Sequence, residues 1–369
     1  MNRTKQPAFQ PNYLVLPGDT LQETIEAKGM SQAELAERLG RPKKTINEII
    51  KGKTAITAET ALQLESVIGV PASFWTNLEA NYREALARQS EEAALQSNIE
   101  WLQHFPVKAM VKLGWLKQIG GEVNRLRGLF RFFGVVGAQE WQYHWSSPQA
   151  VYRKSTAFKS NPYAVAAWLR QGEIEASVLD CAPHARTKFI RTLSDIRGMI
   201  TADPKHFEPA MIKSCAAAGV AVTFIPELPG THLYGATRWL TKSKALIQLS
   251  LRGKTDDHLW FTFFHEAAHI VLHGRRDVFI EAKGEGFDKT DGKEKEKEAS
   301  RYARNLLIPP DEYRAFIAEA VFTDQAIQSF AQRIGIAPGV VVGRLQHDKT
   351  ISFSWGNKLK QHYCFKSQE

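Results

Sequence analysis

One five-residue run in the C-terminal half of the chain has the residue types and the spacing of a zinc site. It reads His265-Glu266-Ala267-Ala268-His269. Because residues i and i+4 lie on one face of a helix, the two imidazoles can bind the same Zn²⁺ at about 2.0–2.1 Å. Glu266 then stands beside the first ligand, where it can act as general base on a zinc-activated water. The run therefore predicts one Zn²⁺ per chain and zinc-dependent hydrolysis of peptide bonds.

The sequence before this run is typical of a buried active-site helix. Its apolar residues are Leu259, Trp260, Phe261, Phe263 and Phe264. A strand is expected from Ala245 to Leu251, and an edge strand next to such a helix can bind a substrate peptide as an added strand. The competing interpretation is a core helix with two surface histidines. The combination of helix and strand disfavours that interpretation.

A catalytic zinc usually has three protein ligands and one open position, so a third ligand must come from later in the chain. The candidates stand in one charged run and are Glu294, Glu296 and Glu298. Most of this run is expected to be the solvated start of a helix. Glu298 differs because it heads an amphipathic stretch with Ala299 and Tyr302. We therefore predict Glu298 as the third ligand, with Glu294, one turn earlier, in reserve.

Three further polar residues are candidates for a supporting role near the metal. His273 lies one turn beyond His269 and is expected to support a ligand or to lie at the rim, rather than to bind the metal. Tyr234 or Tyr302 can donate a hydrogen bond to the oxyanion that peptide hydrolysis develops.

The first ninety residues contain a second pattern, which is typical of a helix-turn-helix. Ser31 is a natural N-cap, and Glu34 completes a capping box with it. Gly40 ends that helix, and a second helix follows from Pro42 to Gly52. The start of the second helix enters the major groove in this motif.

The residues of this motif that we predict to contact DNA are Gln32, Lys43, Lys44, Thr45, Asn47, Lys51 and Lys53. Lysines neutralise phosphates, whereas Thr45 and Asn47 have side chains that can read base edges, and Gln32 can bond at the edge of the groove. A small helical bundle with surface lysines is the competing interpretation. The predicted partner is double-stranded operator DNA.

Composition sets the broad class of the protein. The chain has 369 residues, of which 43% are hydrophobic and 24% charged, as in globular proteins. It contains no apolar run of the roughly 18 residues that a membrane helix needs and no apolar leader, so a cytoplasmic location is expected. The three cysteines are far apart and predict no disulfide framework or cysteine zinc site. The net charge of +9 is compatible with a nucleic-acid partner and equally with a role in solubility alone.

The order of the patterns predicts an α+β, mainly helical fold in three parts. Residues 1–88 are expected to form an all-α helix-turn-helix domain, and residues 89–218 a helical middle region. Residues 219–369 are expected to form a peptidase domain with a small β-sheet, an active-site helix and a C-terminal helix pair. The middle region is rich in aromatic and basic residues, which suit either a packed core or base stacking, and a core is the more common use.

Residues 12–88 resemble the antitoxin HigA, an XRE-family helix-turn-helix repressor. The residues that carry the resemblance are Leu16-Pro-Gly-Asp19, Ser31-Gln-Ala-Glu-Leu-Ala-Glu-Arg-Leu-Gly40, Lys44-Thr-Ile-Asn-Glu-Ile-Ile-Lys-Gly52, Ile56-Thr-Ala-Glu-Thr-Ala-Leu62 and Phe74-Trp-Thr-Asn-Leu78. The resemblance implies a lambda-repressor-like domain that binds its operator as a homodimer. It also implies a toxin-antitoxin system, in which the cognate toxin is a HigB-like ribonuclease.

Residues 219–347 resemble the ImmA/IrrE family of metallopeptidases. The resemblance rests on His265-Glu-Ala-Ala-His-Ile-Val-Leu-His273 and Glu298-Ala-Ser-Arg-Tyr-Ala-Arg-Asn-Leu-Leu-Ile-Pro309. In that family the Glu before the Ala of the second motif is the third zinc ligand, which falls on Glu298. Ser300 and Tyr302 are mild departures from the family pattern. The resemblance implies an endopeptidase that cleaves a repressor or another regulatory protein.

Two functions of different classes follow from these patterns. The first is a DNA-binding transcription regulator whose zinc endopeptidase cleaves a regulatory protein, a toxin or the chain itself, and whose activity can be gated or silent. The alternative is a non-proteolytic repressor or antitoxin in which the zinc fold serves as a partner-binding or sensor module. A purely structural zinc site ranks last, because such sites are usually closed by four protein ligands.

Overall fold

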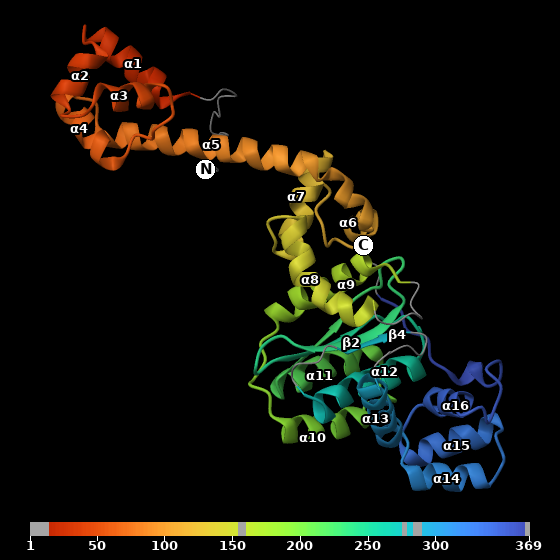
Figure 1. The fold of residues 1–369 in the computed structure, drawn as a ribbon. Coiled ribbons are helices and arrows are strands. Elements are labelled where there is room, and N and C mark those ends of the chain that lie inside the picture. The colour runs from red at the N-terminus through yellow and green to blue at the C-terminus, as the bar shows by residue number, and fades with distance from the viewer. Residues whose placement is uncertain (1–14, 154–159, 275–278, 283–289, 366–369) are drawn as a thin grey trace, which may run out of the picture. The chain divides into compact units, whose positions relative to one another are not determined.

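The computed structural model describes residues 15–153, 160–274, 279–282 and 290–365 (Figure 1). The chain divides into two compact units, Met1–Ile99 and Glu100–Glu369. The expected division into three parts differs from this arrangement. The expected boundary at residue 88 falls inside a long helix, and the boundary at residue 218 falls inside the core of the second unit. The two units are described in turn.

The first unit is a bundle of helices. They are α1 (Pro17–Ala27), α2 (Gln32–Arg38), α3 (Lys43–Ile50), α4 (Ala58–Ile68) and α5 (Ala72–Ser97). The Ser31 hydroxyl accepts a hydrogen bond from the Glu34 backbone N–H at 3.2 Å, so the expected N-cap is confirmed. Gly40 has a φ of 63°, a left-handed conformation that glycine adopts at little cost in the turn between α2 and α3. Apolar residues from every helix meet in one core, and they include Leu21, Leu35, Ile46, Leu64 and Trp75.

The second unit is mainly helical around a small sheet. Before the sheet lie η1 (Ile99–His104), α6 (Val107–Lys112), α7 (Glu122–Phe133), α8 (Ala138–Arg153), α9 (Pro162–Val178), α10 (Arg186–Arg197) and α11 (Pro204–Ala217). The strands are β1 (Val220–Phe224), β2 (Leu233–Trp239), β3 (Ala245–Leu249) and β4 (Phe279–Ala282). The later helices are α12 (Asp256–Leu272), α13 (Thr290–Leu307), α14 (Pro310–Ala318), α15 (Asp324–Ile334), α16 (Pro338–His347) and η2 (Asn357–Leu359).

The sheet is mixed, with the strand order β1-β3-β2-β4. β3 pairs in parallel with β1 over its whole length and antiparallel with β2 on its other side. Its backbone hydrogen-bonding groups are therefore used on both sides, so the expectation that residues 245–251 form a substrate-binding edge strand is wrong. The short strand that follows α12, β4, pairs antiparallel with β2 and lies at one end of the strand order.

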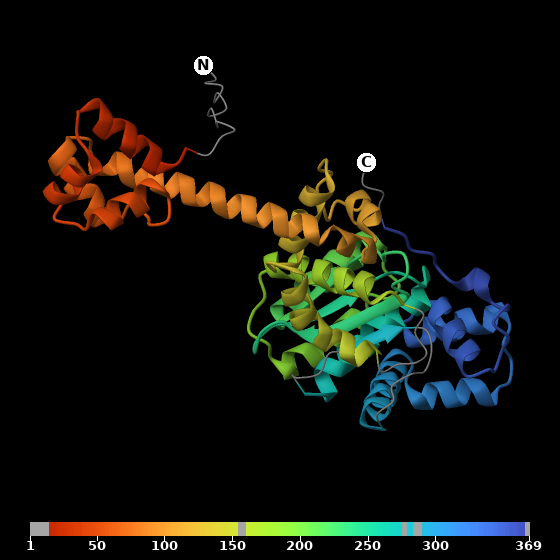
Figure 2. The same ribbon diagram turned by 45° about the horizontal axis from the view of Figure 1, so that its top comes forward.

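Helices cover both faces of this sheet (Figure 2). On β3, the Gln248 side chain points to α9 and donates to the Trp168 backbone carbonyl at 2.7 Å. The adjacent Ile247 points to the opposite face, where it joins the apolar cluster of α12. Alternation of side chains along the strand thus places α9 and α12 on opposite faces. Arg238 of β2 adds an ion pair with Glu173 of α9 at 2.8 Å, which holds α9 to the sheet.

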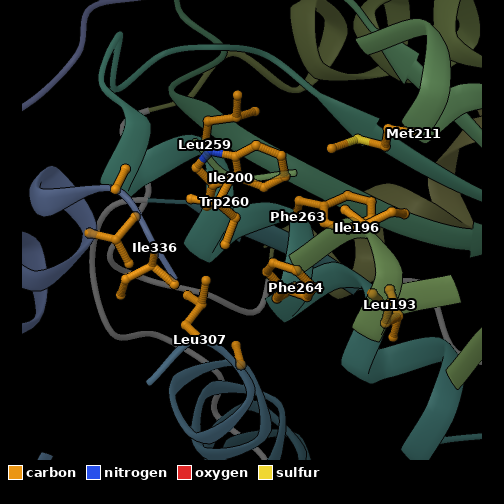
Figure 3. Packing of buried hydrophobic residues seen from close by; sticks show 14 of the residues in the cluster. Leu193, Ile196, Ile200, Met211, Leu259, Trp260, Phe263, Phe264, Leu307 and Ile336 are labelled. Carbon is orange, nitrogen blue, oxygen red and sulfur yellow. The ribbon is translucent and has the colours of Figure 1, made fainter. Parts of the chain in front are cut away.

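One large apolar core lies between the sheet and its helices (Figure 3). Leu193 and Ile196 of α10 and Met211 of α11 pack in the same cluster as Trp260 and Phe263 of α12. Helices α10 and α11, which the sequence assigned to a separate middle region, therefore belong to the same core as α12. Since α12 is buried along most of its length, it is a rigid platform for the side chains that it carries.

The aromatic residues of η1, α7, α8 and α9 form a cluster of their own. The ring of Trp101 lies 5.3 Å from that of Trp141 and 5.2 Å from that of Phe130, and Tyr163 stacks on Trp141 at 5.0 Å. Trp101, Phe130 and Trp141 are buried. The expected core is therefore confirmed for these aromatic residues. Among the described residues, no helix is both long enough and apolar enough to cross a membrane.

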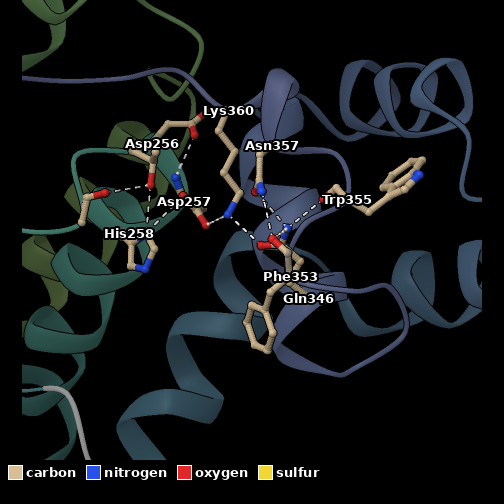
Figure 4. A network of polar contacts seen from close by, with 10 residues as sticks. Asp256, Asp257, His258, Gln346, Phe353, Trp355, Asn357 and Lys360 are labelled. Carbon is tan, nitrogen blue, oxygen red and sulfur yellow. Dashed lines mark hydrogen bonds and ion pairs between the residues drawn. The ribbon is translucent and has the colours of Figure 1, made fainter.

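A polar network ties the C-terminal segment to the first turn of α12 (Figure 4). The Lys360 ammonium donates to Asp257 at 2.7 Å and to the Gln346 side-chain oxygen at 2.8 Å. The Gln346 amide nitrogen donates in turn to the Trp355 carbonyl at 2.8 Å. Because Lys360 and Asp257 are nearly buried, this network holds the start of α12 against α16 and the tail.

Candidate metal centre

Three side chains from two helices converge on one point. The Nε2 atoms of His265 and His269, both on α12, lie 3.1 Å apart. Glu296 of α13 places its Oε2 3.0 Å from His265 Nε2 and its Oε1 3.5 Å from His269 Nε2. Ligand atoms at about 2.0–2.1 Å from a tetrahedral zinc are roughly 3.3 Å from one another. The three separations bracket that value.

The chemistry of the donor atoms fits a cation as well. Two neutral imidazoles whose Nε2 atoms face each other can share only one proton between them. A cation between them instead accepts a lone pair from each, and the carboxylate supplies the negative charge. His265, His269 and Glu296 are therefore a set that suits Zn²⁺, with a fourth position left for a water or a substrate.

The pKa values of His269 and Glu296 favour the protonation states that a metal requires. Burial lowers the pKa of His269 to about 4, so its imidazole is neutral near pH 7. Burial acts to raise the pKa of Glu296, but hydrogen bonds from His265 and His269 hold it down at about 2. Neutral imidazoles and an ionised carboxylate are the forms that bind divalent metals.

The packing of α13 against α12 explains why Glu296 reaches the site. Ala299 and Ala303 are fully buried, and their small side chains let α13 lie close to α12. Glu296 lies one turn before Ser300, and both side chains contact the His265 imidazole. The face of α13 toward the site thus runs through Glu296, Ser300 and Ala303.

The structure places Glu296, and not the predicted Glu298, beside the two imidazoles. Glu298 lies two residues further along α13, which is about 200° around the helix. Its Oε2 is 3.2 Å from His273 Nε2, and its side chain is 44% exposed, against 23% for Glu296. The reserve candidate Glu294 is 62% exposed and forms an ion pair with Lys297. Ala299 and Tyr302 do pack inward, but Glu298 does not point with them toward the two imidazoles. The spacing of Glu296, Ser300 and Ala303 is the signal that identifies Glu296.

Glu266 follows His265 directly on α12 and is fully buried. Strand β2 passes directly over its side chain at Gly235, where an added Cβ would stand 3.0 Å from both the Cγ and the Oε1 of Glu266. Thr237 of the same strand donates to the Glu266 backbone carbonyl at 3.0 Å. Sequence reasoning missed Gly235, whose missing side chain makes this close approach possible. Tyr234, the neighbouring residue on β2, stacks on His258.

The residues predicted to contact DNA lie around α3 in the first unit. Lys43, Lys44, Lys51 and Lys53 are exposed, and Thr45 and Asn47 are partly exposed. Ile46 and Ile49 of the same helix are buried and hold it to the bundle. The amide nitrogen of Gln32 donates to Gln22 at 2.7 Å, so part of its hydrogen-bonding capacity is used within the unit. The surface of α3 therefore presents lysines together with two short polar side chains.

Comparisons with known proteins match both units. The family described as "Helix-turn-helix" matches residues 21–75, and the family described as "IrrE N-terminal-like domain" matches residues 215–346. The HTH-type transcriptional regulator YddM of Escherichia coli (strain K12) is 31% identical over 78 residues, which are 21% of this chain and 83% of that protein. Virulence-associated protein I of Dichelobacter nodosus is 35% identical over 78 residues, 21% of this chain and 72% of that protein. A solved structure, the Pseudomonas aeruginosa antitoxin HigA with the higBA promoter, is 30% identical with a TM-score of 0.21, and the match covers 21% of this chain and 86% of that one.

Proposed function

This chain belongs to the helix-turn-helix family of transcriptional regulators, and we propose that it combines operator binding with zinc-dependent cleavage of a regulatory protein. The cleavage is assigned to the second unit, which carries the IrrE N-terminal-like domain. The observation that carries the proposal is the convergence of two imidazoles and one carboxylate, with the buried Glu266 directly after His265 on the same helix.

Each residue of the proposed site has a separate role in peptide hydrolysis. His265, His269 and Glu296 would hold the metal. A zinc ion in such a site lowers the pKa of a water and polarises the scissile carbonyl. Glu266 would take a proton from the attacking water and later deliver it to the leaving amine. The burial of His265, Glu266 and His269 in α12 strengthens the electrostatic interactions of their side chains.

The cleavage is tested by comparing the full-length protein with its Glu266→Gln variant. Gln has the shape of Glu but cannot take up a proton, so the fold and the metal are expected to remain. Each protein is incubated with a host lysate that includes the products of neighbouring genes, and new protein N-termini are identified by mass spectrometry. Termini that appear only with the wild type, and disappear with a chelator, support a peptidase. The same termini from both proteins would contradict it.

For the first unit, we propose that α3 binds the major groove of a two-fold symmetric operator as part of a homodimer. The exposed lysines supply phosphate contacts, and Thr45 and Asn47 supply base contacts. Selection of bound duplexes from fragmented genomic DNA should return half-sites about 34–36 Å apart, or a multiple of that distance. Recovery without sequence preference would contradict operator recognition. A cognate toxin encoded nearby is a second proposed protein partner, tested by co-purification.

The complete burial of Glu266 under β2 favours one alternative, a repressor whose zinc fold serves as a gated or silent sensor module. In that case the protein binds zinc and operator DNA normally but produces no new termini in the lysate. Cleavage by the isolated wild-type protein would exclude this alternative.

A further inference from the structure

A chain of hydrogen bonds leads away from one of the two histidines of the proposed metal centre. The Nδ1 of His269 lies 3.0 Å from the Nδ1 of His273, which follows the last residue of α12. The Nε2 of His273 lies 3.2 Å from the Oε2 of Glu298 on α13. The His269 and His273 side chains are 1% and 4% exposed, whereas Glu298 is 44% exposed. This series of hydrogen bonds therefore leads from a buried histidine to a carboxylate at the surface.

The contacts between ring nitrogens and the carboxylate determine which nitrogen of His269 and of His273 carries the proton. If His269 offers the lone pair of Nε2 to a metal, its proton must be on Nδ1. That N–H then donates to the Nδ1 of His273, which must carry a lone pair. A neutral His273 has its proton on Nε2, and this N–H donates to the carboxylate of Glu298. Each of the two contacts, His269 to His273 and His273 to Glu298, then joins one donor to one acceptor.

The other proposed histidine ligand, His265, has a different hydrogen-bond partner at its Nδ1 atom. Its Nδ1 lies 3.3 Å from the hydroxyl of Ser300, a neutral group whose hydrogen can rotate. His265 also contacts Glu296, as His269 does. In the described part of the chain, His269 is connected through another imidazole to a carboxylate that lies outside the convergence of the three proposed ligands.

We infer that His273 and Glu298 are positioning residues, which fix the tautomer and the ring orientation of His269 and so increase the metal affinity of the site. This inference rests on the proposed metal centre. Metal-binding histidines usually donate their second N–H to a fixed acceptor, and loss of that acceptor typically lowers metal affinity about 10- to 100-fold. Here the acceptor is an imidazole oriented by a carboxylate. The inference also gives Glu298, the residue that the sequence indicated as a ligand, a role beside the ligand set.

The test measures the zinc dissociation constant of the full-length protein by competition with a chromogenic chelator. His273→Ala and Glu298→Ala are compared with the wild type, and Glu294→Gln is the matched control, since Glu294 is an exposed carboxylate of the same helix. We expect His273→Ala to weaken zinc binding about 10- to 100-fold and Glu298→Ala to weaken it less. Glu294→Gln should bind as the wild type does. Glu298→Gln retains an acceptor oxygen and should restore part of the loss.

A second measurement separates positioning from a general effect on folding. In ¹⁵N NMR spectra of the zinc-loaded wild type, the proton of His269 should be on Nδ1, and this signal should broaden or exchange faster in Glu298→Ala. Circular dichroism of the metal-free variants should match that of the wild type, and because Glu298 is half exposed, its replacement tests the inference even if His273→Ala fails to fold.

The possible failures are distinct. If the wild type does not bind zinc, the proposed metal centre itself is wrong. If the wild type binds zinc, and both alanine variants bind it equally well, only the positioning role is overturned. If Glu298→Ala abolishes binding while Glu296→Gln leaves it unchanged, Glu298 is a ligand, and the inference is again overturned.

Discussion

Two helix pairs of this chain share a local pattern but use it differently. In the first unit, Leu35-Ala36 precedes Gly40 at the end of α2, and α3 follows. In the second unit, Phe330-Ala331 precedes Gly335 at the end of α15, and α16 follows. Both first helices begin with a hydroxyl cap, Ser31 in one and Thr323 in the other. Both glycines are left-handed, with φ of 63° and 69°.

The second helix of each pair has a different environment. Among the residues of α3, only Ile46 and Ile49 are buried, which leaves its lysines exposed. In α16, six of ten residues are buried. An added Cβ at Gly339 would stand 2.2 Å from a carboxylate oxygen of Asp256. The α16 helix is therefore part of the core and cannot enter a DNA groove. Capping residues and a glycine therefore specify the helix pair, while the exposed face of the second helix decides whether that helix can bind DNA.

The largest expected effect comes from breaking the ion pair that secures α12 beside α16. The side chains of Lys360 and Asp257 are 8% and 9% exposed, so Lys360→Met removes the ammonium group that pairs with a buried carboxylate. We expect a loss of about 3–5 kcal/mol in the free energy of unfolding of the second unit, measured by urea denaturation. Lys44→Met on α3 is the control, because the Lys44 side chain is 84% exposed and its loss should change stability little. Equal effects of the two substitutions would contradict the difference between the helix pairs.

A smaller loss of stability is expected from Gly339→Val on α16. The new side chain would collide with the buried Asp256, and overpacking of this kind typically costs about 1–3 kcal/mol. Gly128→Ala in α7 is the control, since nothing lies within 4 Å of its added Cβ and alanine favours a helix. Thermal unfolding should show a lower midpoint for the first variant and an equal or higher one for the second. An unchanged midpoint for Gly339→Val would mean that α16 is not packed as described.

The Asp256 carboxyl group, which packs against α16, gives the stability of the second unit a pH dependence. Burial and the neighbouring Asp257 raise the pKa of Asp256 from 3.8 to about 7. Since the folded state holds this proton more tightly, its stabilising contribution is complete below about pH 4 and is lost as the pH rises through about 7. Asp256→Asn should remove this loss and be more stable than the wild type at pH 8, on the order of 1–2 kcal/mol. Urea titrations at pH 5 and pH 8 measure the free energy of unfolding of both proteins. A wild type that becomes more stable relative to the variant as the pH rises would contradict this prediction.

The smallest effect expected is on DNA binding. Lys44→Ala should weaken binding to all duplexes alike and reduce the slope of log K against log salt by about 1. Arg344→Ala on α16 should change neither quantity, because Arg344 forms an ion pair with Asp348 within the second unit. Fluorescence anisotropy at several salt concentrations measures both. If Arg344→Ala weakens binding as much as Lys44→Ala does, α16 takes part in DNA recognition.

Local patterns in the sequence predicted much of this structure. The helix-turn-helix, α12 and the first two ligands follow from short-range spacing and capping, which act within one element. The choice between Glu296 and Glu298 depends on how α13 is rotated against α12, and a run of alternating Lys and Glu does not encode that rotation. The interior position of β3 depends on pairing with β1 and β2, which is a long-range property. The packing of α10 and α11 into the same core as α12 was missed for the same reason.

We propose that His265, His269 and Glu296 together hold one zinc ion. Anomalous scattering at the zinc edge, from crystals of the full chain grown with zinc, tests it most directly. We expect one peak per chain, about 2.0–2.2 Å from the Nε2 atoms of both histidines and from the Glu296 carboxylate, with one position not filled by protein. The absence of a peak there, or a peak bound by Glu298 instead of Glu296, would contradict it.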